Sequence, residues 1–498
     1  MKILIIGGGI SGLVAACNLQ LKGHQTTLIE KNNFLGGRLN KFKSNETDFC
    51  NGPSWYWMDD IFQEVWDNLH IDSRDRYKLN KLNPQFKIIN RTQEIIIPSE
   101  IKEIKEVFEK IQEKSSNNLD LFISENKYKY NLTKKFMKYP NLSIFEYLNL
   151  NTLNILKYNI FDSYRTFFKK RFSNKILQQI LEWPSYFIGS NPNKISSLFN
   201  ILTYSYLNDG TYIPENGMYS IIEMLEKHYI SLGGKINLNN NLRKVNLYNN
   251  QIVSVDTNIN RYYCDFVISS IDYNYFENLL PKKMQTYSKY YWNNIKTCPS
   301  ALIFHLKLDI NIDKLNIHNL FIDNNIDSYF LEYDITSFPP FYINTNIKNK
   351  TLFILVPISD RAYTESEIDL CLDYITCKIY NLTRIDINNH IENKVILTNK
   401  DYKNIFNSFK DNAYGISCEN LQIGPFRPSI KSLKINNLFY CGQSTNPGPG
   451  LPPCALSGLI VSNYLCEYIH YNMFQRIISY INHYFIIILS NLIMFFNN

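Results

Sequence analysis

The chain has 498 residues, 45% of them hydrophobic and 19% charged, and is therefore long enough for two or three folded domains. It carries 52 basic and 45 acidic residues, and the resulting net charge of +7 is spread along the chain. Such a mild charge does not indicate nucleic-acid binding, but it fits weak attraction to anionic lipid. Ten cysteines are scattered without a C-x-x-C pair, and a strand pattern begins almost at the first residue. We therefore expect reduced thiols, no signal peptide and a cytoplasmic location.

The first predicted elements form a dinucleotide-binding unit. Four apolar residues at positions 3–6 lead into a G-x-G-x-x-G motif at Gly7, Gly9 and Gly12, and a helix-forming stretch follows. The first glycine allows a tight turn, the second lets the backbone approach a pyrophosphate, and the third lets the helix pack on the sheet. Because a helix N-terminus directs N–H groups at phosphates, we expect Ser11 to lie in this phosphate-binding turn.

Glu30 ends the second predicted strand and lies 18 residues after Gly12. Its carboxylate is placed to accept hydrogen bonds from ribose hydroxyls, and it would repel a 2′-phosphate, so NADP is disfavoured. A glycine-rich turn without a ligand is the alternative, but strand, helix and acidic residue all fall in register. NAD and FAD both remain open at this point.

The next segment favours FAD over NAD. Lys31 is followed by a second glycine pair, Gly36 and Gly37, and then by Arg38. A plain NAD-binding domain would continue into its next helix here, whereas this loop brings further N–H groups and a guanidinium to an extended diphosphate. Arginine suits phosphate because its planar fork makes paired, charge-assisted hydrogen bonds. An ordinary Gly-Gly turn with a solvated arginine is the simpler alternative.

The remaining chain predicts two interleaved domains of an α/β fold. Residues from about 80 to 210 read mainly as helices with 3.6-residue apolar spacing, and the stretch from about 285 to 395 contains sheet strands. We expect a Rossmann-like FAD-binding domain and a mixed α+β domain for substrate and membrane binding. The first comprises residues 1–80, 215–285 and 395–470, and the second comprises residues 81–214 and 286–394.

Residues 471–498 form an apolar C-terminal tail. A membrane-spanning helix needs about 20 mainly apolar residues. The run from 477 to 496 reaches that length only by including Asn482, His483, Ser490 and Asn491. We therefore expect an interfacial or docking helix rather than a span, and a peripheral association with the membrane.

Four stretches of the chain resemble the phytoene desaturase family, the bacterial-type carotenoid desaturases within the larger amine-oxidase-like FAD superfamily. The resemblance covers nearly the whole chain up to about residue 468, and the run from Gly52 to Met58, G-P-S-W-Y-W-M, is its most specific part. The four stretches are GGGISG with EKNNFLGGR, residues 48–65, residues 210–225 and residues 437–462.

The resemblance implies that both ends of the chain hold FAD. It places the turn of Gly52, Pro53 and Ser54 near the isoalloxazine ring. The rings of residues 55–57 either line a channel for a flat polyene or fill the core, and core filling is at least as good an interpretation for any single ring. The other residues that the resemblance places beside FAD are Val245, Gly442, Gln443, Gly450, Leu451 and Pro452.

The implied reaction converts phytoene, a long apolar polyene, into a more conjugated carotene such as lycopene or neurosporene. A hydride would pass to the flavin, and a base would then take a proton from the neighbouring carbon. No metal-ligand cluster or Ser-His-Asp arrangement appears in the sequence, and His305 in an apolar strand is expected in the core. Because moving from lipid to an apolar tunnel gains little hydrophobic free energy, the enzyme would collect its substrate at the membrane.

The catalytic base is the least defined part of this interpretation. Some family members carry an Asp-x-x-Arg pair in the helical region, and the comparable stretch here offers Glu146 with Asn149, so the arginine is absent. Glu146 as the base is a hypothesis, and a solvated helix carboxylate is the alternative. Asp209 and Glu215 are weaker candidates.

Three other functions compete with this one. A related carotenoid desaturase or isomerase would act on a later intermediate. A non-catalytic prenyl-lipid-binding protein, as in the Rab GDP-dissociation inhibitors, shares the fold but lacks a working pyrophosphate loop. An amine oxidase would bind a small cation, which suits the aromatic run less well. The sequence leaves the oligomeric state open, and a homo-oligomer is compatible with it.

Overall fold

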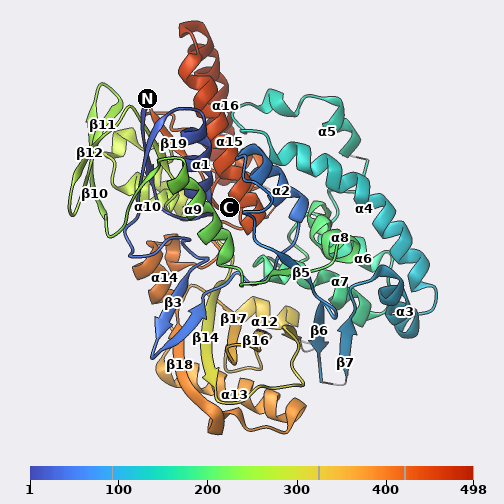
Figure 1. Ribbon diagram of the computed structural model, residues 1–498. Coiled ribbons are helices and arrows are strands. Elements are labelled where there is room, and N and C mark those ends of the chain that lie inside the picture. The colour runs from blue at the N-terminus through green and yellow to red at the C-terminus, as the bar shows by residue number, and fades with distance from the viewer. Residues whose placement is uncertain (92, 156, 323–325, 420–421, 497–498) are drawn as a thin grey trace.

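Two large β-sheets and a helical region organise the protein (Figure 1). The computed structural model describes all residues except 92, 156, 323–325, 420–421 and 497–498. The first sheet is parallel and has the strand order β19-β13-β1-β2-β9. Its strands are β1 (Lys2–Ile6), β2 (Gln25–Ile29), β9 (Lys235–Asn237), β13 (Phe266–Ser269) and β19 (Leu438–Tyr440).

The central strand β1 is apolar from Ile3 to Ile6 because the sheet is covered on both faces. Ile3 and Ile5 join a core cluster with helices on one face, whereas Leu4 and Ile6 join a second cluster on the other. The helices on the first face are α1 (Ile10–Leu21), α2 (Asp59–Asn68), α9 (Ser220–Ser231) and α15 (Leu451–His470). The second face is covered by β10 (Leu242–Tyr248), β11 (Gln251–Thr257), β12 (Arg261–Tyr263), α10 (Tyr273–Asn278) and α11 (Lys289–Asn294).

The second sheet has seven strands in the order β18-β14-β17-β16-β15-β6-β7 and is antiparallel except for the β15–β6 pair. A third core cluster joins it to α13 (Glu365–Thr383). Its strands are β6 (Phe86–Ile89), β7 (Glu94–Ile97), β14 (Ser300–Leu308), β15 (His318–Phe321), β16 (Phe341–Asn346), β17 (Thr351–Ile358) and β18 (Ile391–Leu397).

The stretch predicted as mainly helical contains helices, as expected, but also β6 and β7. These two strands extend the second sheet beside β15, which lies more than 200 residues later. The helices are α3 (Ile101–Ile111), α4 (Ser115–Met137), α5 (Leu150–Ile155), α6 (Tyr164–Lys169), α7 (Lys175–Phe187) and α8 (Asn200–Asn208). The remaining elements are β3 (Lys41–Ser44), β4 (Thr47–Cys50), β5 (Leu79–Lys81), β8 (Tyr212–Pro214), α12 (Ile326–Glu332) and α14 (Asn399–Phe406).

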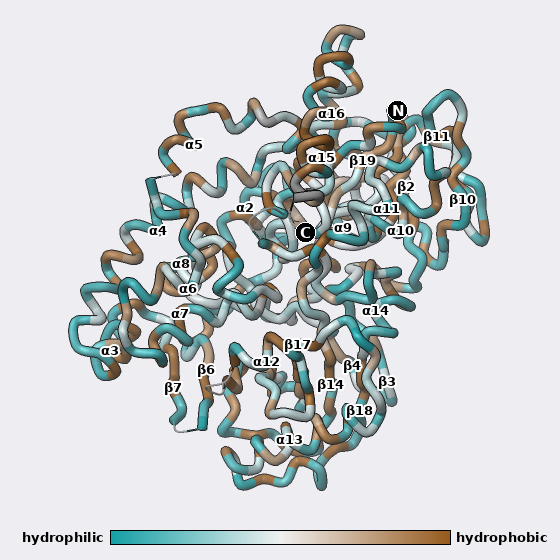
Figure 2. Tube along the Cα trace, turned by 180° about the vertical axis from the view of Figure 1, so that it is seen from behind, coloured by the Kyte–Doolittle hydropathy of each residue, from teal (hydrophilic) through white to brown (hydrophobic). Residues whose placement is uncertain are grey.

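The apolar tail forms helix α16 (Met473–Phe496), which lies against the second core cluster. Ile487 and Met494 are buried there, whereas Phe474 and Ile481 on the same helix are exposed. Figure 2 shows this hydrophobic helix at the top of the molecule. Within the described part of the chain, no helix combines the length and apolar character that crossing a membrane requires. The predicted α/β class, with a Rossmann-like sheet beside a mixed α+β unit, is confirmed.

Candidate cofactor site

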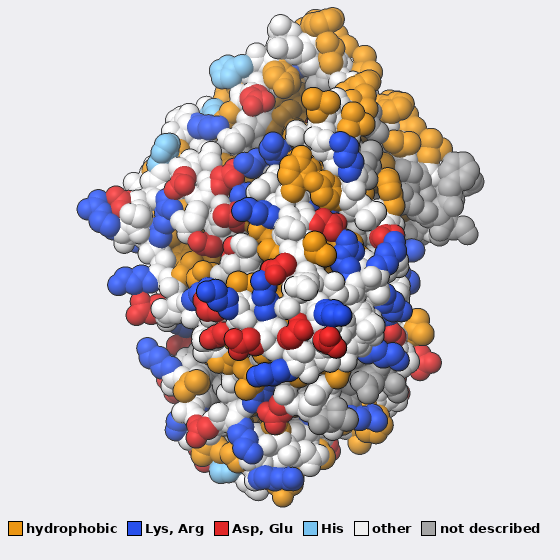
Figure 3. Space-filling model, turned by 90° about the vertical axis from the view of Figure 1, so that its right-hand side faces the viewer, with side chains coloured by type: hydrophobic (Ala, Val, Ile, Leu, Met, Phe, Trp, Pro, Cys, Tyr) orange, Lys and Arg blue, Asp and Glu red, His pale blue; other side chains and the backbone are white. Residues whose placement is uncertain are grey.

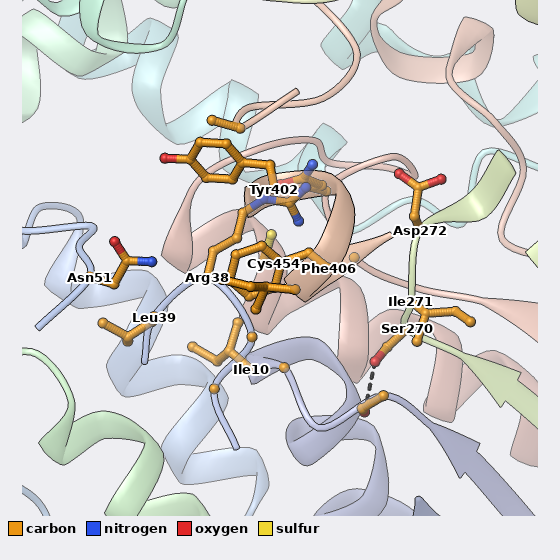
Figure 4. A pocket seen from close by; sticks show the side chains of 18 of the residues that line it. Ile10, Arg38, Leu39, Asn51, Ser270, Ile271, Asp272, Tyr402, Phe406 and Cys454 are labelled. Carbon is orange, nitrogen blue, oxygen red and sulfur yellow. Dashed lines mark hydrogen bonds between the residues drawn. The ribbon is translucent and has the colours of Figure 1, made fainter. Parts of the chain in front are cut away.

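A large cavity lies at the carboxyl ends of the parallel strands, where ligands bind in open α/β sheets (Figure 4). All but three of the predicted cofactor residues line it. They are Gly7, Gly9, Ser11, Glu30, Lys31, Gly36, Gly37, Arg38, Gly52, Pro53, Ser54, Gly442, Gln443, Gly450 and Leu451. The structure thus brings together residues that lie as far apart as positions 7 and 451.

The first glycine turn, at residues 7–9, and the glycine pair at residues 36–37 are joined directly through their backbones. Gly9 and Gly36 form a parallel β-bridge, and the Gly36 N–H donates to the Gly8 carbonyl at 2.8 Å. A Cβ placed on Gly9 would meet no protein atom within 4 Å, so its position faces open cavity. This cradle, which a side chain would fill, fits the close approach of a pyrophosphate.

Gly12 has a packing role rather than a lining role. A Cβ on Gly12 would lie 2.1 Å from the Gly7 carbonyl oxygen and 2.6 Å from Ser270 Oγ. Ser270 follows β13 and donates a hydrogen bond of 2.8 Å to that same carbonyl (Figure 4). The third glycine therefore lets α1 begin directly against the turn, so that its N-terminal N–H groups border the cavity.

Glu30 is buried at the cavity wall, and each of its carboxylate oxygens accepts one backbone N–H. Oε2 accepts from Gly8 at 2.8 Å and Oε1 accepts from Asn32 at 2.9 Å. Burial raises the pKa of Glu30, while these two backbone hydrogen bonds act in the opposite direction. Each carboxylate oxygen keeps a lone pair for a ribose hydroxyl.

Arg38 presents a partly satisfied guanidinium to the cavity. Its Nη2 donates to Ser408 Oγ at 2.8 Å, and its guanidinium lies 5.6 Å from the centre of the Phe406 ring. Its buried Nε has no hydrogen-bond partner among the described residues. Burial lowers the pKa of Arg38, and the nearby Asp272 opposes that effect. An unused donor on a buried cation suits an anionic diphosphate.

Lys31 points away from this diphosphate region. Its ammonium donates to the Asn404 carbonyl at 2.7 Å and to Asn407 Oδ1 at 3.1 Å, at the end of α14. The residue lines the cavity, but its charge is used to tie the cofactor loop to α14. We therefore infer a positioning role for Lys31.

The C-terminal segment closes the cavity from the opposite side. The Ser11 hydroxyl donates to the Cys454 carbonyl at 2.8 Å, which links α1 to the first turn of α15. Gly450 precedes that helix with a φ of 117°, a conformation that side chains rarely adopt. Both ends of the chain thus contribute helix N-termini to one site.

Two further predicted residues do not line the cavity. Val245 is buried in β10 within the second core cluster, and Pro452 lies in the first turn of α15. Asn240, Asn241 and Leu242, just before and at the start of β10, line the cavity in place of Val245. Nothing in the sequence of a strand distinguishes a valine that lines a cofactor cavity from a valine that packs in the core.

Glu146 lies outside the cavity and caps a turn. Its carboxylate accepts the backbone N–H groups of Asn141, Leu142 and Ser143 at 3.0, 2.8 and 2.9 Å. Burial raises its pKa, and the three hydrogen bonds oppose this. Neither Asp209, at the end of α8, nor the exposed Glu215 lines the cavity. The geometry therefore gives no support to these carboxylates as the base.

The aromatic run after Ser54 fills the core instead of lining the cavity. Trp55 stacks on His318 with ring centres 3.9 Å apart, and Tyr56 is fully buried. Trp57 donates from Nε1 to Thr211 Oγ1 at 2.8 Å. His305 is also buried, as expected, with Nε2 3.2 Å from Asn51 Oδ1. None of the three rings lines the cofactor cavity or the apolar cavity beside it, so their packing supports the core-filling interpretation.

A second cavity adjoins the first and has an apolar wall. Tyr342, Leu355 and Tyr414 line both cavities, so the two meet at these side chains. The sequence interpretation missed all three, because they lie in strands and loops without a motif. The other residues of the second cavity are Trp183, Tyr186, Pro299, Leu320, Phe321, Ile322, Ile326, Phe330, Pro340, Phe341 and Pro357.

The fold and this site define an FAD-dependent oxidoreductase. The chain belongs to the family of flavin-containing amine oxidoreductases, whose model matches residues 10–466. Among solved structures, a putrescine oxidase bound to putrescine has a TM-score of 0.61 at 13% identity, covering 94% of this chain and 99% of that one. A Rab GDI from Plasmodium falciparum has a TM-score of 0.52 at 13% identity, covering 93% and 97%. These two similarities show the fold alone.

Curated relatives cover almost the whole chain. It is 24% identical over 484 residues to a carotenoid 3,4-desaturase of Haloarcula japonica, which covers 93% of this chain and 98% of the relative. It is 25% identical over 492 residues to a 4,4'-diapophytoene desaturase (4,4'-diaponeurosporene-forming) of Staphylococcus aureus, with coverages of 91% and 96%.

Proposed function

We propose that this protein desaturates an acyclic carotenoid precursor in an FAD-dependent reaction, converting phytoene to a more conjugated carotene such as lycopene or neurosporene. The names of the two curated relatives support the reaction class.

The observation that carries the proposal is the chemistry of the second cavity. None of the described residues that line it is Asp, Glu, Lys, Arg or His. A polyene hydrocarbon has no polar group that needs a partner, whereas a small cationic amine would lose its hydration without gaining a counter-charge. The cavity therefore favours a polyene over an amine.

The proposed chemistry divides between cofactor and protein. Bound FAD supplies the hydride acceptor. The substrate loses a hydride from one carbon and a proton from the next, and the electron pair of the second C–H bond becomes the new double bond. Around this step, the apolar side chains Leu320, Phe341 and Leu355 exclude water that would trap a cationic intermediate. Gly9, Glu30 and Arg38 would hold the dinucleotide.

Two alternatives remain distinguishable from the main proposal. A desaturase or isomerase acting on a later intermediate would leave phytoene unchanged but would convert a partly desaturated carotene. A prenyl-lipid-binding protein would need no pyrophosphate cradle, and the open space at Gly9 together with the unused Arg38 donor argues against it.

We further propose that the protein collects its substrate at a membrane surface. Apolar side chains of α16 are exposed, including Phe474, Ile481 and Phe485. Leu150 and Leu153 of α5 are exposed as well. Figure 3 shows hydrophobic side chains gathered at the upper end of the side of the molecule that it views. Such a surface suits partial insertion between lipid headgroups, because the other face of α16 packs against the protein.

Co-expression in a bacterium that accumulates phytoene tests the proposal. We expect coloured cells and a chromatographic shift from phytoene to longer conjugated products. A parallel strain supplied with a later intermediate separates the desaturase alternatives. Colourless cells that contain folded, FAD-loaded protein and unchanged phytoene would overturn the proposal.

A further inference from the structure

A buried hydrogen-bonded chain runs from the cofactor cavity into the second sheet. Ser54 Oγ lies 2.7 Å from the Tyr342 hydroxyl, and that hydroxyl lies 2.6 Å from His318 Nδ1. Ser54 and Tyr342 both line the cofactor cavity, and Tyr342 also lines the apolar cavity. The chain therefore begins where cofactor and substrate would meet.

The directions of these hydrogen bonds follow from the chemistry of the partners. The Asn344 amide nitrogen, which can only donate, lies 3.4 Å from His318 Nδ1. His318 Nδ1 is then the acceptor nitrogen, so it receives the Tyr342 O–H and the ring hydrogen lies on Nε2. Tyr342 in turn accepts from the Ser54 hydroxyl. The chain thus points from Ser54 through Tyr342 to the Nδ1 lone pair of His318.

Both titratable members are neutral. Burial lowers the pKa of His318 to about 3, and burial raises the pKa of Tyr342 well above its usual range. His318 is fully buried, stacks on Trp55, and its Nε2 has no hydrogen-bond partner among the described residues. A neutral imidazole is a proton acceptor, and a weak one suffices, because a carbocation beside a C–H bond is a very strong acid.

The apolar cavity offers few other acceptors. The apolar cavity has three hydroxyl groups, those of Tyr186, Tyr342 and Tyr414, and no carboxylate or imidazole among its described lining residues. Tyr186 lies against charged groups, accepting from Arg165 Nη2 at 2.6 Å and donating to Asp327 Oδ1 at 3.1 Å. Among the described residues, Tyr342 alone of the three is hydrogen-bonded to a histidine.

We propose that Tyr342 takes the proton that the substrate loses and passes its own hydroxyl proton to His318. This inference rests on the proposed function. In the step, the substrate C–H bond breaks and leaves its electron pair as the new double bond. A new O–H bond forms at Tyr342 while its former proton forms an N–H bond at His318 Nδ1. Before the next turnover this proton moves back to Tyr342 and leaves by way of the Ser54 hydroxyl to water in the cofactor cavity, so that His318 is neutral again.

Three single variants of the FAD-loaded protein test this step. Tyr342→Phe keeps the ring in the cavity wall but removes the hydroxyl. His318→Asn keeps an acceptor near the Nδ1 position but cannot take a proton. Tyr229→Phe is the matched control, because it removes the hydroxyl of another buried tyrosine that lines neither cavity. For each, the measurements are FAD content, phytoene binding in vesicles and the product formed per flavin.

We expect Tyr342→Phe and His318→Asn to retain FAD and bind phytoene while product formation falls roughly 10²–10⁴-fold, the usual contribution of a general base. Tyr229→Phe should stay close to wild type. Product formation at the wild-type rate in His318→Asn would reduce the chain to a positioning role and overturn the proposal. A wild-type protein that binds FAD but forms no product would instead contradict the proposed function.

A readout independent of turnover tests the geometry. In protein with ¹⁵N-labelled histidine rings, the His318 ring should be neutral at neutral pH and should carry its hydrogen on Nε2. Its Nδ1 resonance should move in Tyr342→Phe and stay unchanged in Tyr229→Phe. An Nδ1-protonated ring for His318, identified by its loss in His318→Asn, would contradict the relay whatever the activity.

Discussion

Gly458 of α15 lies directly against the backbone of Ser11 in α1, and a Cβ on Gly458 would be 2.3 Å from the Ser11 carbonyl oxygen. The nearby Ser11 hydroxyl donates to the Cys454 carbonyl at 2.8 Å. Two helices from opposite ends of the chain thus cross at their closest approach beside the cofactor turn. Because backbone atoms form the contact, neither helix can move away cheaply.

This crossing predicts that Gly458→Ala destabilises the protein, although alanine is the better helix former. Overpacking against backbone costs about 1–3 kcal/mol, which should appear as a lower urea midpoint. The control is Glu467→Ala at an exposed position of the same helix, expected within about 0.5 kcal/mol of wild type. Equal stability of Gly458→Ala and the control would contradict the close crossing.

Gly9→Ala should separate cofactor binding from folding. Its methyl group would enter open cavity and meet no protein atom within 4 Å, so the apoprotein should keep its far-UV circular dichroism and thermal midpoint. FAD affinity should fall by roughly ten- to a hundredfold, since a steric intrusion costs about 1–3 kcal/mol. Gly12→Ala, whose Cβ would lie 2.1 Å from the Gly7 oxygen, should lose stability as well. An FAD affinity equal to that of wild type in Gly9→Ala would exclude this cradle as the pyrophosphate site.

Glu277 predicts a pH dependence of stability. It is buried and accepts from the Thr286 and Tyr287 N–H groups and the Tyr440 hydroxyl, and burial raises its pKa to about 7. Between about pH 4.5 and about pH 7 the folded state holds a proton that the unfolded chain has lost, so stability falls as pH rises. The change is on the order of 3 kcal/mol. Urea unfolding should show this decline in wild type relative to Glu277→Gln, and parallel profiles would contradict it.

The exposed face of α16 predicts membrane attachment. Removing residues 477–498 should lower binding to phospholipid vesicles and leave FAD bound, but it also removes the buried Ile487 and Met494. A sharper variant changes only Phe474, Ile481 and Phe485 to glutamine. Its vesicle binding should fall because burying each such side chain contributes about 1.5–3 kcal/mol.

The matched control for α16 is Leu370→Gln, which changes an exposed leucine on α13 at the other end of the molecule (Figure 1). We expect this control to bind vesicles as wild type does. Unchanged vesicle binding after both the triple substitution and the truncation would show that α16 is not the attachment surface.

The sequence predicted the parts of the site that lie close together in the chain. Gly7, Gly9, Glu30 and Arg38 fall within the first 38 residues, and short-range turn and strand patterns place them. The resemblance added the distant Gly450 turn, whose glycines and prolines form a distinctive run. All of these positions can be predicted from local conformation or from a motif.

The remaining site residues depend on long-range packing. Tyr342 reaches the cavity junction because β16 pairs with β15 and β17, and His318 faces it from the neighbouring strand. Nothing in the strand sequence FYINTN separates such a tyrosine from a core residue. Trp55 shows the reverse case, since its conspicuous sequence suggested a channel whereas packing against His318 buries it.

The central claim is that this flavoprotein removes hydrogen from phytoene, and anaerobic mixing of the FAD-loaded protein with phytoene-containing vesicles tests it most directly. We predict that the visible flavin absorption bleaches as the absorption of a longer conjugated product grows. A preparation of Gly9→Ala from which FAD has been removed should show neither change. Flavin that stays oxidised while phytoene is bound and unchanged would contradict the account.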